Sequence, residues 1–170
     1  MRLVRPEAPS DTDAVRRVVE GAFGQPEEAD LLGRLREALP DGQYLGFVAV
    51  KANEVVGHVA FTPVTLEPER PDLDLRGLAP MAVLPEHQRS GVGRAMVREG
   101  LDACRRDGAG AVVVLGDPAY YRMLGFRPAA LFGLGCTYDA PPEAFMALEL
   151  APGALGEASG VARYHAAFAG

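Results

Sequence analysis

The segment Leu73–Leu115 constrains the fold of this chain more than any other part of the sequence. It predicts a long strand over Leu73–Val83, a loop with two glycines, a helix that ends near Asp107, and an apolar strand over Ala111–Leu115. A strand that is apolar at every position is typical of a parallel strand covered on both faces. We therefore expect a mixed α/β sheet with a buried strand.

Two helices are predicted before this segment. A short strand over Leu3–Pro6 leads to a helix with apolar residues at helical spacing over Ala14–Ala22, and Ser10 is its expected N-cap. A second helix is expected over Glu27–Leu39, ahead of a proline and a glycine that end it. The chain thus opens with one strand and two helices.

The remaining elements are mostly strands. Leu45–Val50 and Val55–Phe61 are rich in β-formers and flank a tight connection, which predicts a hairpin. After the apolar strand we expect a short helix over Pro118–Leu124, a strand over Ala144–Leu150 and a closing strand over Tyr164–Phe168. The predicted order is β-α-α-β-β-β-α-β-α-β-β.

Composition limits the class of protein. The chain has 170 residues, 48% of them hydrophobic, which predicts one domain over residues 1–170. The net charge of −6 argues against nucleic acid as a partner. No apolar run approaches the roughly 20 residues of a membrane span, and no signal peptide is visible at the N-terminus. We expect a cytoplasmic protein with no membrane partner, as a monomer or homodimer.

Cysteine and histidine residues give no sign of a metal site. Cys104 and Cys136 make no metal-binding spacing, and in a cytoplasmic chain two thiols are expected to be free and mostly buried. The three histidines, His58, His87 and His165, are far apart in the sequence, so no zinc site is expected.

The clearest chemical signal is the loop Gln88–Arg94, between the long strand and its helix. Gly91 and Gly93 let the backbone approach a ligand closely, and the first N–H groups of a helix have no partner inside the helix. With the positive end of the helix dipole behind them, these groups suit a pyrophosphate. The same residues would also be expected at a helix N-terminus where glycines only help the helix to begin and no ligand binds.

Two other phosphate-binding loops fit less well. A Walker A loop needs a Gly-Lys-Ser/Thr sequence, which is absent from the chain. The Rossmann fingerprint needs a third glycine where Met96 stands, and it should follow the first strand of its domain. Here two helices and three other predicted strands precede the strand that the loop follows, so the order of elements opposes that class.

A second signal lies just past the apolar strand, where open α/β sheets place ligands. Tyr120 and Tyr121 are adjacent on a short predicted helix, so one can pack in the core while the other faces a cleft. Two tyrosines packed under a helix, with no further role, would give the same pattern. Gly125 and Phe126 follow Tyr121 at the end of this helix.

In combination, these signals resemble the GNAT superfamily of N-acetyltransferases, and in particular its small bacterial members. The resemblance is sharpest over Leu78–Phe126, which holds a proline in a strand at Pro80, the glycine loop, the helix, the apolar strand and the tyrosine. It implies an α/β fold with a mixed, mostly antiparallel sheet, splayed at its central strands, with helices on both faces. The segment after Phe132 is atypical.

The resemblance also implies an activity and its residues. Acetyl-CoA would be the co-substrate, and a small amine or a protein amino group would be the acceptor. The loop would hold the pyrophosphate through Gln88, Arg89, Ser90, Gly91, Val92, Gly93 and Arg94. The pantetheine arm would pair like an added strand with the backbone of Met81, Ala82 and Val83. Tyr121 stands where the family has its general acid, which protonates the departing CoA thiolate.

The sequence does not assign the general base. Family members often supply a glutamate from the long strand, but the segment Arg76–Pro85 contains no acid. His58, Glu86 and Asp74 are candidates, and so is a water held by backbone carbonyls. A histidine titrates near neutral pH and suits a base, although a lone strand histidine is more often a satisfied core residue.

The acceptor site has no specific signature. Phe23, His58 and Phe61 are expected to contribute to it, together with Glu143–Phe145. We expect direct attack of the amine on the thioester, because both cysteines lie away from the motifs. A non-catalytic acyl-CoA-binding or regulatory module on the same fold is the alternative, since an acidic base is missing.

Overall fold

The structure is a computed structural model that describes residues 2–156 and 159–169. The chain forms two compact units, each with its own core. Unit 1 contains residues 2–61, 79–100 and 166–169, and unit 2 contains residues 62–78 and 101–165 where these are described. Two long strands, β3 (Glu54–Glu67) and β4 (Leu75–Val83), run through both units. The expectation of a single domain stays a prediction.

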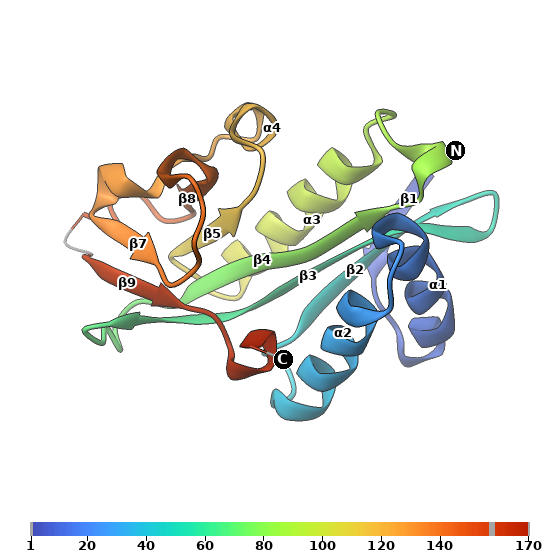
Figure 1. Ribbon diagram of the computed structural model, residues 1–170, viewed down its shortest axis with the longest axis horizontal. Helices are drawn as coiled ribbons and strands as arrows, with labels where there is room; N and C mark the ends of the chain where they lie inside the picture. The colour runs from blue at the N-terminus through green and yellow to red at the C-terminus, as the bar shows by residue number, and fades with distance from the viewer. Residues whose placement is uncertain (1, 157–158, 170) are drawn as a thin grey trace. The chain divides into compact units, whose positions relative to one another are not determined.

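Unit 1 is built on antiparallel strands (Figure 1). β1 (Arg2–Pro6) pairs with β2 (Leu45–Lys51), and β2 pairs with the first part of β3. Ala52 and Asn53 connect β2 to β3 with φ of 52° and 64°, as expected for the two-residue turn that suits the twist of a hairpin.

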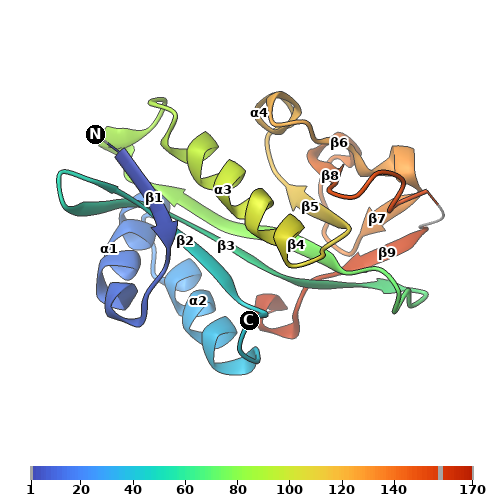
Figure 2. The same ribbon diagram turned by 180° about the vertical axis from the view of Figure 1, so that it is seen from behind.

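Helices cover the two faces of these strands. α1 (Thr12–Phe23) and α2 (Glu27–Ala38) pack on one face, where the buried core consists of Val15, Val18, Val19, Ala29, Leu32, Val48, Val55, Ala60 and Ala82. α3 (Val92–Arg106) packs on the other face in its first part, as Figure 2 shows from behind. A β-carbon on Gly57 would lie 2.9 Å from the Met96 side chain, and one on Gly100 would overlap Phe61. Glycine at these two positions therefore allows α3 to approach β3 closely.

Unit 2 combines a parallel and several antiparallel strand pairs. The first part of β4 pairs in parallel with β5 (Ala111–Leu115), which confirms the parallel strand expected there. β5 pairs with β8 (Phe145–Glu149), and β8 with β6 (Arg127–Pro128), both antiparallel. β9 (Gly160–Arg163) pairs antiparallel with the end of β3 and parallel with β7 (Leu134–Cys136).

Short helices complete the chain. α4 (Pro118–Met123) follows β5, and single turns of 3₁₀ helix span Pro9–Asp11, Pro85–His87, Ala129–Phe132, Pro142–Ala144 and Ala166–Ala169. The strand order is β1-β2-β3-β4-β5-β8-β6, with β7 and β9 off this path. This mixed, mostly antiparallel sheet with helices confirms the expected α/β fold. No helix within residues 2–156 and 159–169 is long and apolar enough to span a bilayer.

Two local predictions are wrong. Ser10 is not the cap of α1, because it lies inside the 3₁₀ turn Pro9–Asp11 and α1 begins at Thr12. The closing strand expected over Tyr164–Phe168 is also absent: β9 ends at Arg163, and the 3₁₀ turn Ala166–Ala169 follows. The strand is placed earlier because its pairing with Thr65–Glu67 of β3 fixes its register.

Candidate active site

The loop after β4 has the backbone geometry of an anion site. Arg89 and Gly91 have φ of 58° and 86°, in the left-handed region. The Gly91 carbonyl accepts the N–H of Ala95 at 3.0 Å, so helical hydrogen bonding begins at Gly91. The N–H groups of Val92–Arg94 therefore belong to the first turn of α3, where they have no helical partner and are available to a ligand.

Side chains hold this loop in place within unit 1. Arg2 Nη1 donates to the Ser90 carbonyl at 3.0 Å, and the Ser90 hydroxyl donates to the His87 carbonyl at 2.5 Å. Gln88 Nε2 donates to the Val83 carbonyl at 3.0 Å, which ties the loop to the end of β4. The expected loop residues are thus brought together, and Arg2 is a further member that the sequence pattern did not reveal.

A groove of about 510 Å³ lies beside the loop. Three of its lining residues are arginines and one is acidic, in a chain whose net charge is −6. An anionic ligand suits such a surface better than a cationic one. The lining consists of Arg2, Leu3, Val4, Gly91, Arg94, Ala95, Arg98 and Glu99.

The strand residues expected to pair with pantetheine lie past the β5 ladder. The parallel pairing of β4 covers Leu75–Leu78, and the strand then runs on through Ala79–Val83. Met81 and Val83 are half-buried, while Ala82 packs into the core under α1 and α2. This position agrees with the splay expected at Pro80.

Tyr121 is held tightly inside unit 2. It is 7% exposed on α4 and contacts Tyr120 and Phe126 edge-to-face, with ring centroids 5.0 and 5.5 Å apart. Burial, and then the neighbouring Tyr120, raise the pKa of the Tyr121 hydroxyl above its usual value. The hydroxyl is therefore protonated at neutral pH, as a general acid must be.

Local structure explains the placement of Tyr121. The Asp117 carboxylate accepts the Ala119 N–H at 3.0 Å and caps α4. The Phe126 N–H donates to the Tyr121 carbonyl at 3.1 Å, and Gly125 makes the turn with φ of 99°. Hydrogen bonds thus fix both ends of α4 and, with them, the position of Tyr121.

His58 is part of a buried polar cluster in unit 1. Its Nε2 lies 2.5 Å from Glu7 Oε1, and the Tyr44 hydroxyl donates to the same oxygen at 2.9 Å. Arg36 Nε donates to Glu7 Oε2 at 2.8 Å. The side chains of His58 and Glu7 are 0% and 6% exposed. We call the four residues Glu7, Arg36, Tyr44 and His58 the polar cluster.

The other expected acceptor residues lie in different environments. Phe23 is 41% exposed at the C-terminal end of α1, so it can contact a ligand. Phe61 is fully buried against Gly100 and belongs to the core, so the expectation that it lines the acceptor site is wrong. Its position on a strand close to α3 leaves it no accessible face.

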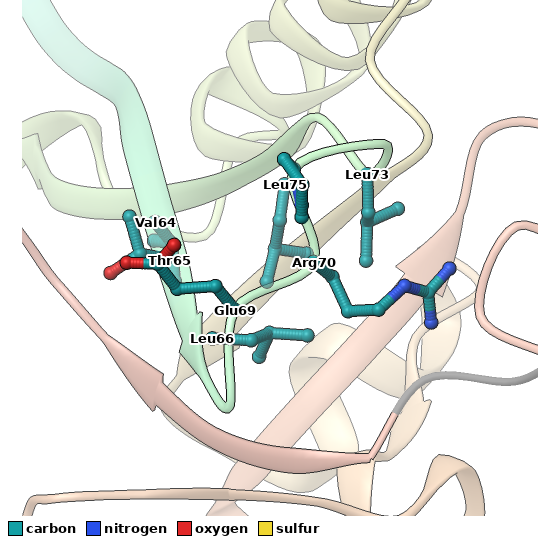
Figure 3. A pocket seen from close by; sticks show the side chains of 8 residues that line it. Val64, Thr65, Leu66, Glu69, Arg70, Leu73 and Leu75 are labelled. Atoms are coloured by element: carbon teal, nitrogen blue, oxygen red, sulfur yellow. The ribbon is translucent and has the colours of Figure 1, made fainter.

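A second hollow, of about 280 Å³, lies in unit 2 where β3 turns into β4 (Figure 3). It contains none of the expected site residues and is lined by Val64, Thr65, Leu66, Glu69, Arg70, Pro71, Leu73 and Leu75. Arg70 makes two hydrogen bonds to the Asp72 carboxylate, at 3.0 and 2.9 Å. We assign this hollow no part in the chemistry.

Neither cysteine is placed as a nucleophile. Cys104 is free and buried, and burial raises the pKa of its thiol to about 12. Cys136 is free and half-buried, and its thiol lies 3.8 Å from the Tyr138 carbonyl. Within residues 2–156 and 159–169, no group of three or more His, Cys, Asp or Glu side chains is arranged to hold a metal ion.

Comparison with known proteins identifies the class. The acetyltransferase (GNAT) domain family matches residues 3–129. The uncharacterized N-acetyltransferase YhbS of Escherichia coli is 39% identical over 168 residues, which cover 98% of each chain. This chain therefore belongs to the GNAT acetyltransferases, and it is an N-acetyltransferase by family.

Two solved structures are similar over nearly the whole chain. The Escherichia coli YhbS structure in complex with CoA has a TM-score of 0.91 at 38% identity and covers 99% of this chain and 92% of its own. A GNAT acetyltransferase of Brucella melitensis in complex with acetyl-CoA has a TM-score of 0.78 at 34% identity, covering 99% and 98%.

Proposed function

We propose that this chain transfers the acetyl group of acetyl-CoA to an amine by direct attack of the amine on the thioester. The observation that carries the proposal is the loop geometry: two left-handed residues, Arg89 and Gly91, precede three helix-start N–H groups. Similar proteins that were crystallised with CoA and acetyl-CoA support the same ligand. The acceptor is a small amine or a protein amino group.

The proposal gives a role to the glycine loop, to the end of β4 and to Tyr121. The N–H groups of the loop hold the pyrophosphate, and the backbone of Met81–Val83 pairs with the pantetheine arm. Tyr121 donates its hydroxyl proton to the thiolate that leaves. Direct attack is supported by the burial of Cys104, because the thiolate and not the thiol is the nucleophile.

The proposal is tested by binding and by turnover. Isothermal calorimetry with acetyl-CoA, ATP and NAD should give heat of binding for acetyl-CoA alone. Thiol release should then depend on an added amine, in a panel that includes polyamines, amino acids, aminoglycosides and peptides with free N-termini. Binding of ATP or NAD in place of acetyl-CoA would contradict the proposal.

A non-catalytic acyl-CoA-binding module is the second candidate. It is favoured by one observation, the lack of any acidic residue over Arg76–Pro85 of β4 and the turn after it. Acetyl-CoA would then bind without thiol release with any amine of the panel. In either case we propose a cytoplasmic protein that acts as a monomer or homodimer.

A further inference from the structure

β1 is an edge strand of the sheet. It stands at one end of the strand order and, among residues 2–156 and 159–169, it pairs only with β2. An edge strand presents backbone N–H and C=O groups with which a further strand can pair. β1 therefore has one free edge, and its register with β2 decides which residues face that edge.

The hydrogen bonds to β2 show which backbone groups of β1 are free. The Glu7 N–H donates to the Gly46 carbonyl at 2.8 Å, just past the end of β1 and in the same register. Hydrogen-bonded residues alternate in an antiparallel pair, so Leu3 and Arg5 also direct their N–H and C=O groups to β2. Val4, between them, points the other way. The Val4 N–H and C=O therefore face the free edge.

Pro6 agrees with this assignment. It lies two residues after Val4 and so faces the same edge, where the missing N–H of a proline removes no hydrogen bond to β2. Prolines and charged residues on edge strands limit uncontrolled pairing between chains. The free edge of β1 thus suits one short added strand and not a long one.

The groove of about 510 Å³ lies along this edge. Arg2, Leu3 and Val4 of β1 line it on one side, and the start of α3 with Gly91 before it lines the other. The beginning of β1 lies beside the loop that leads into α3, where Arg2 donates to the Ser90 carbonyl (Figure 2). A strand that adds to β1 would lie in this groove, with the first turns of α3 beside it.

This groove is distinct from the strand that is proposed to hold pantetheine. None of the residues Met81–Val83 is part of its lining. β4 is three strands away from β1 in the strand order, which corresponds to roughly 14 Å at the usual spacing. Of the loop Gln88–Arg94, only Gly91 and Arg94 line the groove. A ligand there would bind in addition to the proposed acetyl-CoA.

The arginine side chains that line the groove are not neutralised. Arg2 donates to the Ser90 carbonyl, and Arg94 and Arg98 make no ion pair with any described residue. Glu99 is the acidic residue of the lining. The lining is therefore positive in a chain whose net charge is −6. Complementarity of charge favours an acidic ligand.

The two faces of β1 determine the side-chain pattern of the ligand. The Arg2 side chain reaches Ser90, so it lies on the α3 face, and by alternation Leu3 lies on the opposite face, where it is 57% exposed. The side chains of an added strand alternate in the same way. Carboxylates at every second position would meet Arg94 and Arg98, and apolar side chains at the others would pair with Leu3.

From these relationships we propose that the free edge of β1 and the first turns of α3 bind an acidic, extended segment of a partner protein. The segment adds to β1 as an antiparallel strand. Its backbone pairs with the Val4 N–H and C=O, and its carboxylates contact Arg94 and Arg98. The inference goes beyond the proposed acetyl transfer, because this binding needs neither acetyl-CoA nor Tyr121.

A peptide blocked at both ends tests the proposal. The probe is a short fluorescein-labelled peptide of alternating valine and glutamate, with no free amine that could be acetylated. Fluorescence anisotropy should show saturable binding that weakens as added salt screens the charges. The same peptide with glutamine in place of glutamate should bind at least about 5-fold more weakly.

Methylation of the peptide backbone separates strand addition from attraction by charge. In an antiparallel pair, the residue opposite Val4 has its side chain on the α3 face and exchanges both hydrogen bonds with Val4. These are the glutamates of the probe. N-methylation of the glutamate amides should therefore abolish binding, and N-methylation of the valine amides should not. Equal binding of the two methylated peptides would overturn the inference.

Charge reversal on α3 locates the binding. Arg98→Glu should weaken binding of the peptide by at least about 5-fold. Arg17→Glu is the matched control, because Arg17 is also exposed and the net charge changes equally, but it lies on α1, which covers the other face of the sheet. Equal affinities in the two folded variants would place the peptide elsewhere and contradict the proposal.

Hydrogen exchange followed by NMR tests the edge without altering the protein. The peptide should slow exchange of the Val4 N–H, which faces the free edge. The N–H groups of Leu3 and Arg5, which are already paired with β2, should change little. Binding that leaves the exchange of Val4 unchanged would exclude strand addition.

Two other ligands give the competing outcomes. Saturating CoA should not displace the peptide, and displacement would show that the groove belongs to the cofactor site and overturn the inference. A short DNA duplex should bind more weakly than the peptide. If the duplex binds more tightly and Arg98→Glu weakens it, the partner is a nucleic acid and the proposed acidic segment is wrong.

Discussion

Gly116 lies directly against the ring of Tyr121. A β-carbon at Gly116 would stand 2.6 Å from Cε2 of the tyrosine, closer than β-carbons in folded proteins approach other atoms, and 3.2 Å from Cδ2, a tight contact. The glycine at the end of β5 therefore allows the proposed general acid to occupy its buried position. This contact brings the turn after β5 against a residue inside α4.

We predict that Gly116→Ala displaces the Tyr121 ring and lowers turnover. Misplacing a reacting group typically lowers the reaction rate by up to about 10²-fold. We therefore expect kcat to fall by roughly 10-fold or more. Acetyl-CoA affinity by calorimetry should change little, because the loop Gln88–Arg94 is untouched. Gly135→Ala is the matched control in unit 2, where a β-carbon meets no atom within 4 Å. Equal turnover in both variants would contradict the prediction.

Tyr121 itself should affect the chemical step more than binding. Tyr121→Phe keeps the ring contacts with Tyr120 and Phe126 and removes only the hydroxyl. General acid catalysis is worth roughly 10²–10⁴-fold, and a thiolate leaves more easily than an alkoxide, so turnover should fall by about 10- to 1000-fold. Single-turnover kinetics and calorimetry measure the two effects separately.

Tyr120→Phe is the control for this variant, because the two side chains project about 100° apart on the helix. A damaging Tyr120→Phe together with a silent Tyr121→Phe would show that the motif was assigned to the wrong tyrosine. If both variants are silent with a good acceptor, neither hydroxyl acts as the acid.

The glycine loop should control cofactor affinity through its backbone. Gly91 has φ of 86°, and its β-carbon would lie 3.2 Å from Arg2 Nη1, so Gly91→Val strains the turn and crowds its anchor. We expect acetyl-CoA affinity to fall by at least 10-fold, with the fold retained by circular dichroism, and Gly93→Val should act in the same direction.

Gly108→Val provides the matched control for backbone strain. Gly108 has φ of 88° and open space around its β-carbon, and it lies past the other end of α3. This variant should bind acetyl-CoA normally. If Gly91→Val binds equally well, the pyrophosphate does not lie on this loop.

The cysteines should be dispensable for chemistry. Cys104 is buried with its pKa raised to about 12, which leaves almost no thiolate at neutral pH. A Cys104→Ala/Cys136→Ala double variant should keep most of its turnover per folded molecule. An acetyl adduct on the wild type by mass spectrometry, absent from the double variant, would point to an acyl-cysteine intermediate instead of direct transfer.

Local patterns were sufficient to predict most elements of this fold. The run of β-formers in Val55–Phe61 and the apolar run of Ala111–Leu115 reflect burial on both faces, which depends on the segment itself. The same patterns could not place β9, because a strand of four residues is defined by its pairing with Thr65–Glu67 and not by its own sequence. Ser10 does not cap α1 for a local reason, because the 3₁₀ turn Pro9–Asp11 includes it and precedes the helix.

The candidate site likewise contains some residues that the sequence predicts and others that it does not. Glycines at Gly91 and Gly93 mark the loop from sequence, but Arg2 is 88 positions from Ser90, and Glu7 is 51 positions from His58. Contacts between residues so far apart in the sequence cannot be predicted from a local pattern. Phe61 and His58 looked alike as strand residues near the site, and only the packing of Gly100 against one and of Glu7 against the other separates a core residue from a polar pair.

Glu7 should make the free energy of unfolding of the protein depend on pH in the acidic range. Its pKa is lowered in the folded chain, so the stabilisation is present above the unfolded pKa of about 4.3 and is lost as the pH falls through the lower folded value. Removing one partner of a buried ion pair costs about 3–5 kcal/mol. Since Arg36 is 24% exposed, we expect Glu7→Gln to cost about 2–3 kcal/mol at pH 7.

Thermal unfolding between pH 7 and pH 3 measures this dependence. The difference in unfolding free energy between wild type and Glu7→Gln should be largest at neutral pH and should shrink below pH 4, where the wild-type carboxylate takes up its proton. Asp11→Asn is the matched comparison, because Asp11 is also buried, also paired with an arginine and also lowered in pKa, but does not contact His58 directly. A difference between wild type and Glu7→Gln that stays constant with pH would show that Glu7 stabilises the fold by packing and not by its charge.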